Sequence, residues 1–203
     1  MRYHDLITES KTNNVTVFYG GRFQPMHQGH FSLYKKLVSR FGADNVFIAT
    51  TFSKDAQKQH LAGDYSKNPF SFDEKKAIIS KMFGIPVNHI LNTSPYRPSV
   101  ELAGRKPNET AVVLAFSEKD DDRLMSGGAL APLPDAADEL QAADENRVYF
   151  VKMPVEAGGM SATDFRNTMA SDADPKKKAQ VFQQFFGKFD QEIFNFIEGR
   201  LKQ

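Results

Sequence analysis

Short apolar runs alternate along the chain with segments in which apolar residues recur every three or four positions. Runs rich in β-branched and aromatic residues predict buried strands at residues 15–20, 45–51, 89–93, 111–116 and 147–153. Apolar residues at helical spacing predict helices at 26–40, from Ser71 to Gly84, after Ser161, and once or twice in the phenylalanine-rich tail. The polar stretch 53–70 predicts a long loop, and the stretch 126–146, rich in Gly, Ala and Pro, predicts an excursion or flap.

This alternation of strands and helices predicts an α/β fold. Its sheet should be mainly parallel, with about five strands, flanking helices and right-handed crossovers. We expect residues 1–170 to form this domain and residues 171–203 a C-terminal helical extension packed on it, although an oligomer interface or a lid would also use that aromatic face. Ligands of such sheets bind at the carboxyl ends of the strands, and the chemically unusual stretches 20–30, 117–123 and 157–166 all follow predicted strands.

The composition then excludes several classes of protein. The 203 residues are 40% hydrophobic, which suffices for the core of one domain, and they include no cysteine, which excludes disulfides and thiolate chemistry. The net charge of +1 and the lack of a basic and aromatic stripe argue against a nucleic-acid partner. No apolar stretch reaches the ~18 residues that a membrane span needs, and the polar N-terminus does not resemble a signal peptide, so we expect a cytoplasmic protein.

The stretch GGRFQPMHQGH at positions 20–30 gathers groups that bind anions. Its two leading glycines allow a ligand to approach the backbone, and the start of the following helix offers free N–H groups. His27 and His30 are three positions apart, which places them on one helix face, and Gly29 keeps that face low. Arg22 adds a permanent positive charge. These residues alone leave two alternatives open: an anion site, or a strand-turn-helix with two surface histidines.

The stretch GGMSATDFR at positions 158–166 has the spacing of a capped helix start, with Ser161 and Asp164 as the cap residues. A capped helix start behind two glycines is also an anion site. Thr163 and Arg166, one turn into the helix, can hold a pyrophosphate through a hydroxyl group and a forked guanidinium.

The string GRFQPMHQGH resembles the HxGH signature of the nucleotidyltransferase superfamily, in particular the GRFQPxHxGH form of nicotinamide-mononucleotide (NMN) adenylyltransferases of the archaeal and bifunctional types. The string MSATDFR resembles the C-terminal motif of the same superfamily. The resemblance implies a Rossmann-like fold and the transfer of a nucleoside monophosphate from ATP to a phosphate-bearing acceptor, with release of pyrophosphate. NMN is the favoured acceptor, which would give NAD. Mg²⁺ would be bound mainly through the substrate phosphates, without a dedicated set of protein ligands. A cytidylyltransferase, an adenylyltransferase for another phosphate such as FMN, and a nucleotide-binding regulator without turnover stay open, as does a homo-oligomer.

The resemblance also implies roles for individual residues. The catalytic residues would be His27, His30 and Arg166, with His30 at the α-phosphate. The nucleotide-binding residues would be Gly21, Arg22, Phe23, Gln24, Gly29, Lys119, Asp120, Ser161 and Thr163. The acceptor-binding residues would be Asn68, Phe70, Tyr96 and Arg97. For the last group the structural alternatives are a loop that enters a capped helix at 67–75 and a turn fixed by Pro95 and Pro98.

Overall fold

A computed structural model describes residues 14–117, 130–134, 140–142, 148–153 and 160–203. The chain divides into two compact units that alternate along the sequence. The first unit holds the described residues within 1–21, 34–49 and 93–155, and the second holds those within 22–33, 50–92 and 156–203.

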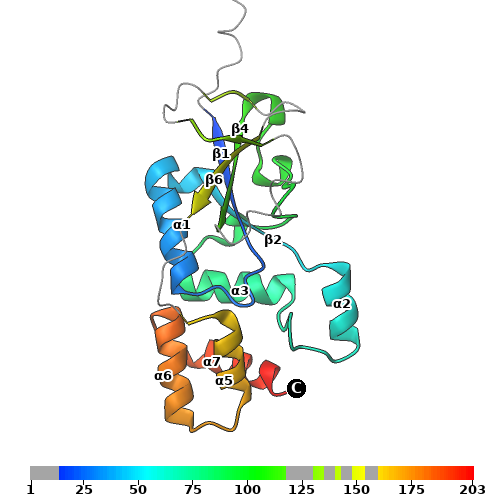
Figure 1. Ribbon diagram of the computed structural model, residues 1–203, viewed down its shortest axis with the longest axis vertical. Coiled ribbons are helices and arrows are strands. Elements are labelled where there is room, and N and C mark those ends of the chain that lie inside the picture. Colours follow the sequence, from blue (N-terminus) through cyan, green and yellow to red (C-terminus); the bar gives the residue numbers. More distant parts are fainter. Residues whose placement is uncertain (1–13, 118–129, 135–139, 143–147, 154–159) are drawn as a thin grey trace, which may run out of the picture. The chain divides into compact units, whose positions relative to one another are not determined.

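A mainly parallel sheet of six strands confirms the predicted α/β fold. The strand order is β3-β2-β1-β4-β6-β5, and Figure 1 shows β1, β4 and β6 side by side. Parallel pairing joins β1 to both β2 and β4, and β6 to both β4 and β5. The strands are β1 (Val15–Gly20), β2 (Val46–Thr50), β3 (Ile90–Asn92), β4 (Ala111–Ser117), β5 (Leu130–Pro132) and β6 (Val148–Met153). The short β5 lies within the stretch that the sequence predicts as an excursion.

The strand order reverses between β1 and β4. From β1 the sheet continues through β2 to β3 on one side, while β4, β6 and β5 lie on the other. The carboxyl ends of two strands at such a reversal are where open parallel sheets bind ligands. The segment after β1 begins at Gly21 and carries the two histidines, whereas the segment after β4 begins outside the described residues.

The second unit is mainly helical, and it contributes β3 to one edge of the sheet. Figure 1 shows α5, α6 and α7 grouped beside α3. Helix α1 starts in this unit and continues into the first. The helices are α1 (Gln28–Phe41), α2 (Lys54–Leu61), α3 (Phe72–Phe83), α5 (Ala162–Ala170), α6 (Pro175–Phe186) and α7 (Gln191–Leu201), and short 3₁₀ turns lie at Ala43–Asn45, Val87–His89, Glu101–Ala103 and Pro107–Glu109. None of the helices in the described ranges is both long and apolar enough to cross a membrane.

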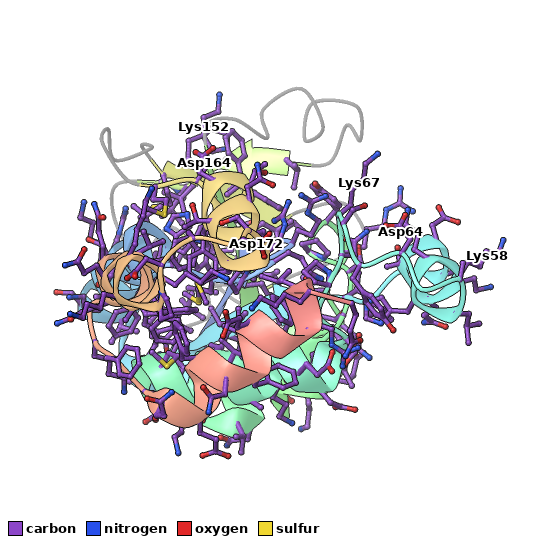
Figure 2. The ribbon with its side chains drawn as sticks, turned by 90° about the horizontal axis from the view of Figure 1, so that it is seen from below. Lys58, Asp64, Lys67, Lys152, Asp164 and Asp172 are labelled. Carbon is purple, nitrogen blue, oxygen red and sulfur yellow. The ribbon has the colours of Figure 1, made fainter. Side chains whose placement is uncertain are left out.

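Helix α2 lies where the sequence predicts a loop, so that prediction was wrong. The Ser53 side chain caps the helix by accepting from the Ala56 N–H, and Ala56 is the one residue of α2 that is buried. A helix with so little apolar surface has no stripe at helical spacing, and its sequence therefore looks like a polar loop. Figure 2 shows Lys58 on this helix and Asp64 just after it, and both views show α2 standing apart from α3 and α5–α7.

Helix α3 begins and ends as the sequence predicts. Ser71 and Glu74 form a reciprocal capping box at the start of α3, and Gly84 ends the helix with a left-handed φ of 69°. The C-terminal helices share a phenylalanine cluster in which Phe165 stacks on Phe185, with ring centroids 4.0 Å apart, and Phe182 and Phe186 are fully buried. Burial of several aromatic rings is a large source of stabilisation for these short helices.

Candidate functional site

The two histidines cap the start of α1 with their rings. The His27 Nδ1 accepts from the backbone N–H of Gly29 at 3.1 Å and of His30 at 3.4 Å. In return, the His27 N–H donates to the Nδ1 of His30 at 3.3 Å. The rings are close, with centroids 3.7 Å apart, but His27 precedes the helix as a cap and does not share a helix face with His30 as the spacing predicts. Because both Nδ1 atoms accept hydrogen bonds, both neutral rings carry their proton on Nε2.

Both histidines are neutral at physiological pH. Burial lowers the pKa of His27 to about 4. Burial, and secondarily the charge of His27, lowers the pKa of His30 to about 3. Within the described ranges the structure shows no hydrogen bond from either Nε2–H. The pair can therefore donate two hydrogen bonds to a bound anion, while any positive charge at the site must come from other residues.

Gly29 is required by the close approach of the His27 ring. A Cβ atom at position 29 would lie 3.0 Å from Cε1 and 3.1 Å from Nδ1 of His27. These distances are too short for an undisturbed ring, so the lack of a side chain at this position is what allows the imidazole to lie over the helix start.

Aromatic residues hold the histidine rings on two sides. Phe23 meets His30 edge to face, with centroids 5.2 Å apart, and Phe185 of α6 meets His27 at 5.3 Å. Phe23 is buried and has a φ of 46°, in the left-handed region that a bulky residue rarely adopts. The Gln28 side chain donates to the carbonyl of Phe186, which is a second link from the start of α1 to α6. The C-terminal helices therefore support the histidine pair directly.

Gln24 joins three segments of the second unit. Its side-chain amide donates to the carbonyl of Phe70 at 2.8 Å and accepts from the N–H of Phe70 at 3.0 Å. Its own carbonyl accepts from the Arg166 Nη1 at 2.7 Å. Gln24 is 3% exposed, so these buried polar groups are satisfied by one another. The loop before α1, the segment before α3 and helix α5 are thus joined at one residue.

The start of α5 has the predicted cap. The Ser161 hydroxyl accepts from the Asp164 N–H at 3.1 Å and donates to the Asp164 carboxylate at 2.6 Å. Figure 2 shows Asp164 on α5. One turn into the helix, the Arg166 Nη2 donates to the Thr163 hydroxyl at 3.3 Å. The motif residues Ser161, Thr163 and Arg166 therefore belong to a single turn of helix.

Two arginines lie near each other without a neutralising carboxylate. Burial lowers the pKa of Arg166, and the repulsion of Arg22 lowers it further. Arg22 is exposed, and among the described residues no ion pair links either guanidinium to an acidic side chain. The guanidinium of Arg166 stays charged at neutral pH. Two neighbouring cations without an ion pair among the described residues form an environment that favours a polyanion.

Lys75 of α3 is a buried cation that the motifs do not include. It is 1% exposed, and its Nζ donates to the Thr50 hydroxyl at 2.7 Å and to the carbonyls of Thr51 at 2.9 Å and Arg22 at 3.3 Å. Burial, and then the charge of Arg22, lowers the pKa of Lys75 to about 7. A signal was present in the sequence, because Lys75 lies three, four and seven positions before Ile78, Ile79 and Met82 on the buried face of the helix.

The residues expected to bind the acceptor have other neighbours in the structure. The Asn68 amide donates to the Gln59 side chain at 3.0 Å, which closes the segment around α2, and Phe70 is fully buried. In the first unit, Tyr96 is 38% exposed and stacks on Phe116, with centroids 5.6 Å apart, and Arg97 is exposed.

The other expected contacts lie near the ends of strands or outside the described residues. The Gly21 N–H donates to the carbonyl of Ala49 at 3.2 Å, and a Cβ atom at Gly20 would lie 2.8 Å from the Cβ of Pro95. Lys119 and Asp120 lie outside the described residues. Among the residues that the structure places, no group of three or more His, Asp or Glu side chains is arranged to hold a metal ion.

Comparison with known proteins relates both motifs to one family. A family model described as cytidylyltransferase-like matches residues 18–167, a span that contains the histidine pair and Arg166. A nicotinamide-nucleotide adenylyltransferase from Methanolobus tindarius is 35% identical over 96 aligned residues, which cover 38% of this chain and 50% of the relative. The chain therefore matches about half the length of that curated relative.

One solved structure shows the likeness of the fold, and a second aligns with a lower score. A nicotinic acid mononucleotide adenylyltransferase from Plasmodium falciparum, complexed with APC, has a TM-score of 0.52 at 10% identity, over 94% of this chain and 98% of that one. A bifunctional NMN adenylyltransferase/ADP ribose pyrophosphatase from Francisella tularensis, complexed with AMP and a manganese ion, has a TM-score of 0.49 at 17% identity, over 94% of this chain and 49% of that one.

Proposed function

We propose that this chain, which belongs to the cytidylyltransferase-like family, is an adenylyltransferase that joins ATP to NMN and releases pyrophosphate, forming NAD. The observation that carries the proposal is the histidine cap: two neutral rings at the start of α1 whose Nε2–H groups remain as donors. Arg166, bound to the carbonyl of Gln24 in the same unit, supplies the positive charge that the histidines lack. The 35% identity to a protein named for this activity supports the choice of acceptor.

The proposed reaction is an in-line displacement at the α-phosphorus of ATP. An oxygen of the acceptor phosphate forms a bond to this phosphorus, and the bond from the phosphorus to the oxygen that bridges to the β-phosphate breaks. The attacking phosphate is ionised at neutral pH, so no general base is needed, and catalysis depends on position and on stabilising charge. The Nε2–H groups of His27 and His30 would donate to the α-phosphate, where negative charge develops in the transition state.

The triphosphate would be held by the second motif and by the loop before α1. Arg166, Thr163, Ser161 and the free N–H groups at the start of α5 are proposed to bind the β- and γ-phosphates, with Arg22 as an additional cation. In the same proposal Gly21, Phe23, Gln24 and Gly29 shape the loop around the nucleotide. Lys119 and Asp120 stay predicted nucleotide contacts.

Mg²⁺ fits this arrangement as an ion that would bind together with the phosphates of the substrate. The described groups proposed to face the phosphates are mainly N–H donors, and such groups do not ligate Mg²⁺, so the phosphate oxygens would provide most of its ligands. Bound there, the ion would neutralise phosphate charge in the displacement.

For the acceptor, the exposed Tyr96 and Arg97 are proposed to contact the base and the phosphate, because an aromatic face and a guanidinium suit those two groups. The side chains of Asn68 and Phe70 are engaged in a hydrogen bond and in the core of the second unit, so any role of theirs in acceptor binding is proposed to act through the segment they fix. The description of the matching family keeps CTP as a second candidate nucleotide.

A substrate screen tests the proposal. The protein is incubated with Mg²⁺, with ATP or CTP, and with NMN, nicotinic acid mononucleotide or FMN, and pyrophosphate and the dinucleotide are both quantified. We expect the fastest release of pyrophosphate with ATP and NMN, together with an equal amount of NAD. Faster release with CTP or with another acceptor would overturn the substrate assignment, and no release from any pair would overturn the enzyme class.

A further inference from the structure

The proposed mechanism leaves Lys75 without a role, although this buried lysine of α3 contacts the loop that carries the histidines through the carbonyl of Arg22. Its ammonium has three N–H donors, and the structure provides three acceptors, on Thr50, Thr51 and Arg22. All three donors are therefore used inside the protein, and with 1% of the residue exposed Lys75 cannot itself touch a ligand. Its contact with the Arg22 carbonyl fixes the backbone two positions before Gln24.

The geometry of this cluster suits both the charged and the neutral lysine. A neutral amine has two N–H donors and one lone pair, so it can keep the carbonyls of Thr51 and Arg22 as acceptors. The Thr50 hydroxyl must then reverse and donate to the amine, giving up its contact of 3.4 Å with the Arg22 carbonyl. Titration of Lys75 therefore changes the charge of the cluster more than its shape.

The charged groups around Lys75 leave it without a counter-ion of its own. Arg22 repels it, and Arg166 on α5 is repelled by the same arginine. Glu74, next to it on α3, pairs with Arg200 of α7. His27 and His30 are neutral above a pH of about 4. Among the described residues no ion pair involves Lys75. A polyanion bound beside Arg22 would therefore supply negative charge to Arg22, Arg166 and the protonated form of Lys75.

We propose that Lys75 is a positioning residue for the triphosphate: it joins the Arg22 carbonyl to the end of β2, and it takes up a proton when the triphosphate binds. The inference rests on the proposed function, since it takes the anion to be a nucleoside triphosphate. Burial and Arg22 hold the pKa of free Lys75 at about 7, so the lysine is largely neutral at pH 8 before binding. A bound anion favours the ammonium and raises that pKa, and the complex then holds more protons than its parts.

Calorimetric titration with MgATP at pH 8, without an acceptor, measures this proton uptake directly. The titration is repeated in two buffers of different ionisation enthalpy, and the difference in heat gives the number of protons bound. At this pH MgATP is fully ionised and both histidines are far above their pKa. The variants are Lys75→Met, Lys75→Arg, which cannot titrate, and the control Lys76→Met, which removes a half-buried lysine over the Phe72 ring of the same helix.

We expect the wild-type protein and Lys76→Met to take up on the order of half a proton or more, and both Lys75 variants to take up none. The MgATP affinity of the wild-type protein should also fall about tenfold more between pH 6 and pH 8 than that of Lys75→Arg, because the loss of the lysine charge above its pKa weakens binding. The wild-type pH profile alone preserves the test if Lys75→Met does not fold.

Equal proton uptake by the wild-type protein and either Lys75 variant would overturn the role of Lys75 while leaving the adenylyltransferase proposal intact. Uptake that depends on Lys75 in a protein that forms no NAD would support the role of Lys75 and overturn the choice of acceptor. A wild-type protein that does not bind MgATP would overturn both.

Discussion

The guanidinium of Arg166 donates to the main-chain carbonyl of Gln24 across 2.7 Å, although the two residues are 142 positions apart in the sequence. The same arginine donates to Thr163, and the side chain of Gln24 is fixed by the backbone of Phe70. The two motifs that resemble nucleotidyltransferases are therefore linked by a buried, charge-assisted hydrogen bond. Arg166 has a structural task in addition to its proposed contact with phosphate.

Replacement of Arg166 should separate these two tasks. In Arg166→Ala the carbonyl of Gln24 loses a charged donor, which should cost about 1–3 kcal/mol of unfolding free energy, and MgATP affinity should fall about 10–100-fold. Arg166→Lys keeps a charge and can keep the bond to Gln24, so it should recover most of the stability but little of the affinity. Chemical denaturation and calorimetric titration measure the two effects. Full affinity in Arg166→Ala would contradict the phosphate role.

Gly29→Ala should reduce turnover without a loss of stability. The added Cβ would lie 3.0 Å from the His27 ring, which must shift by a few tenths of an ångström, while alanine is about 1 kcal/mol better than glycine within a helix. We expect kcat to fall at least about tenfold, because a misplaced donor no longer meets the transition state. Steady-state kinetics measures the change in kcat, and thermal denaturation measures the change in stability. Gly199→Ala in α7, where a Cβ meets open space, is the matched control.

The contact of Phe185 with His27 predicts that the C-terminal helices affect catalysis. Phe185→Ala removes the ring that meets His27 at 5.3 Å and that stacks on Phe165, next to Arg166. It should lower kcat more than it raises the KM for the acceptor, in addition to a stability loss of about 3 kcal/mol. Phe189→Ala, which removes an aromatic residue 40% exposed, is the control for a general loss of aromatic packing. Equal effects of the two variants on kcat would argue against a specific role of Phe185.

The depressed pKa values of the histidines predict how stability depends on pH. The folded-state pKa values of His27 and His30, about 4 and about 3, lie below the ordinary value of 6.5. At a pH between the folded-state and the ordinary values, the unfolded chain therefore binds more protons than the folded chain, and the stability of the fold decreases as the pH drops below about 6.5. From pH 7.5 to pH 5.5 we expect a loss of about 2–3 kcal/mol of unfolding free energy, to which the two histidines contribute about equally. The double variant His27→Asn/His30→Asn should lack this loss, whereas His89→Asn should keep it. Denaturant titrations at the two pH values measure it.

The pattern of apolar residues predicted the elements that bury a face. The strands from Val15 and Ala111, the capping box of α3 and the cap at Ser161 all follow from local signals that agree with the tertiary structure. Helix α2 did not follow, because its single buried residue, Ala56, leaves no apolar stripe to detect. The pattern of apolar residues therefore predicts a helix or strand only where that element buries one of its faces.

The site was predicted less completely than the fold, for a related reason. The motifs identify His27, His30 and Arg166, but they do not show that His27 is a cap outside the helix, or that Gln24 is occupied by the backbone of Phe70. The cap bond of His27 is local, but the spacing of the two histidines fits a helical position equally well, whereas the bonds of Gln24 join segments 46 positions apart that no local signal relates. For Lys75 the sequence holds one local signal, its place on the apolar face of α3, but the acceptors on Thr50, Thr51 and Arg22 that allow its burial come from other segments.

The histidine pair is proposed to stabilise charge at the α-phosphate of ATP during transfer to NMN. The most direct measurement compares the wild-type protein with His30→Ala, both supplied with ATP, NMN and Mg²⁺, and follows NAD and pyrophosphate together with the affinity for NMN. We expect equal amounts of NAD and pyrophosphate from the wild-type protein, and a loss of kcat of about 100-fold or more in His30→Ala with NMN affinity within about threefold. An unchanged kcat in His30→Ala, with the whole loss of kcat/KM due to weaker binding of NMN, would contradict this role.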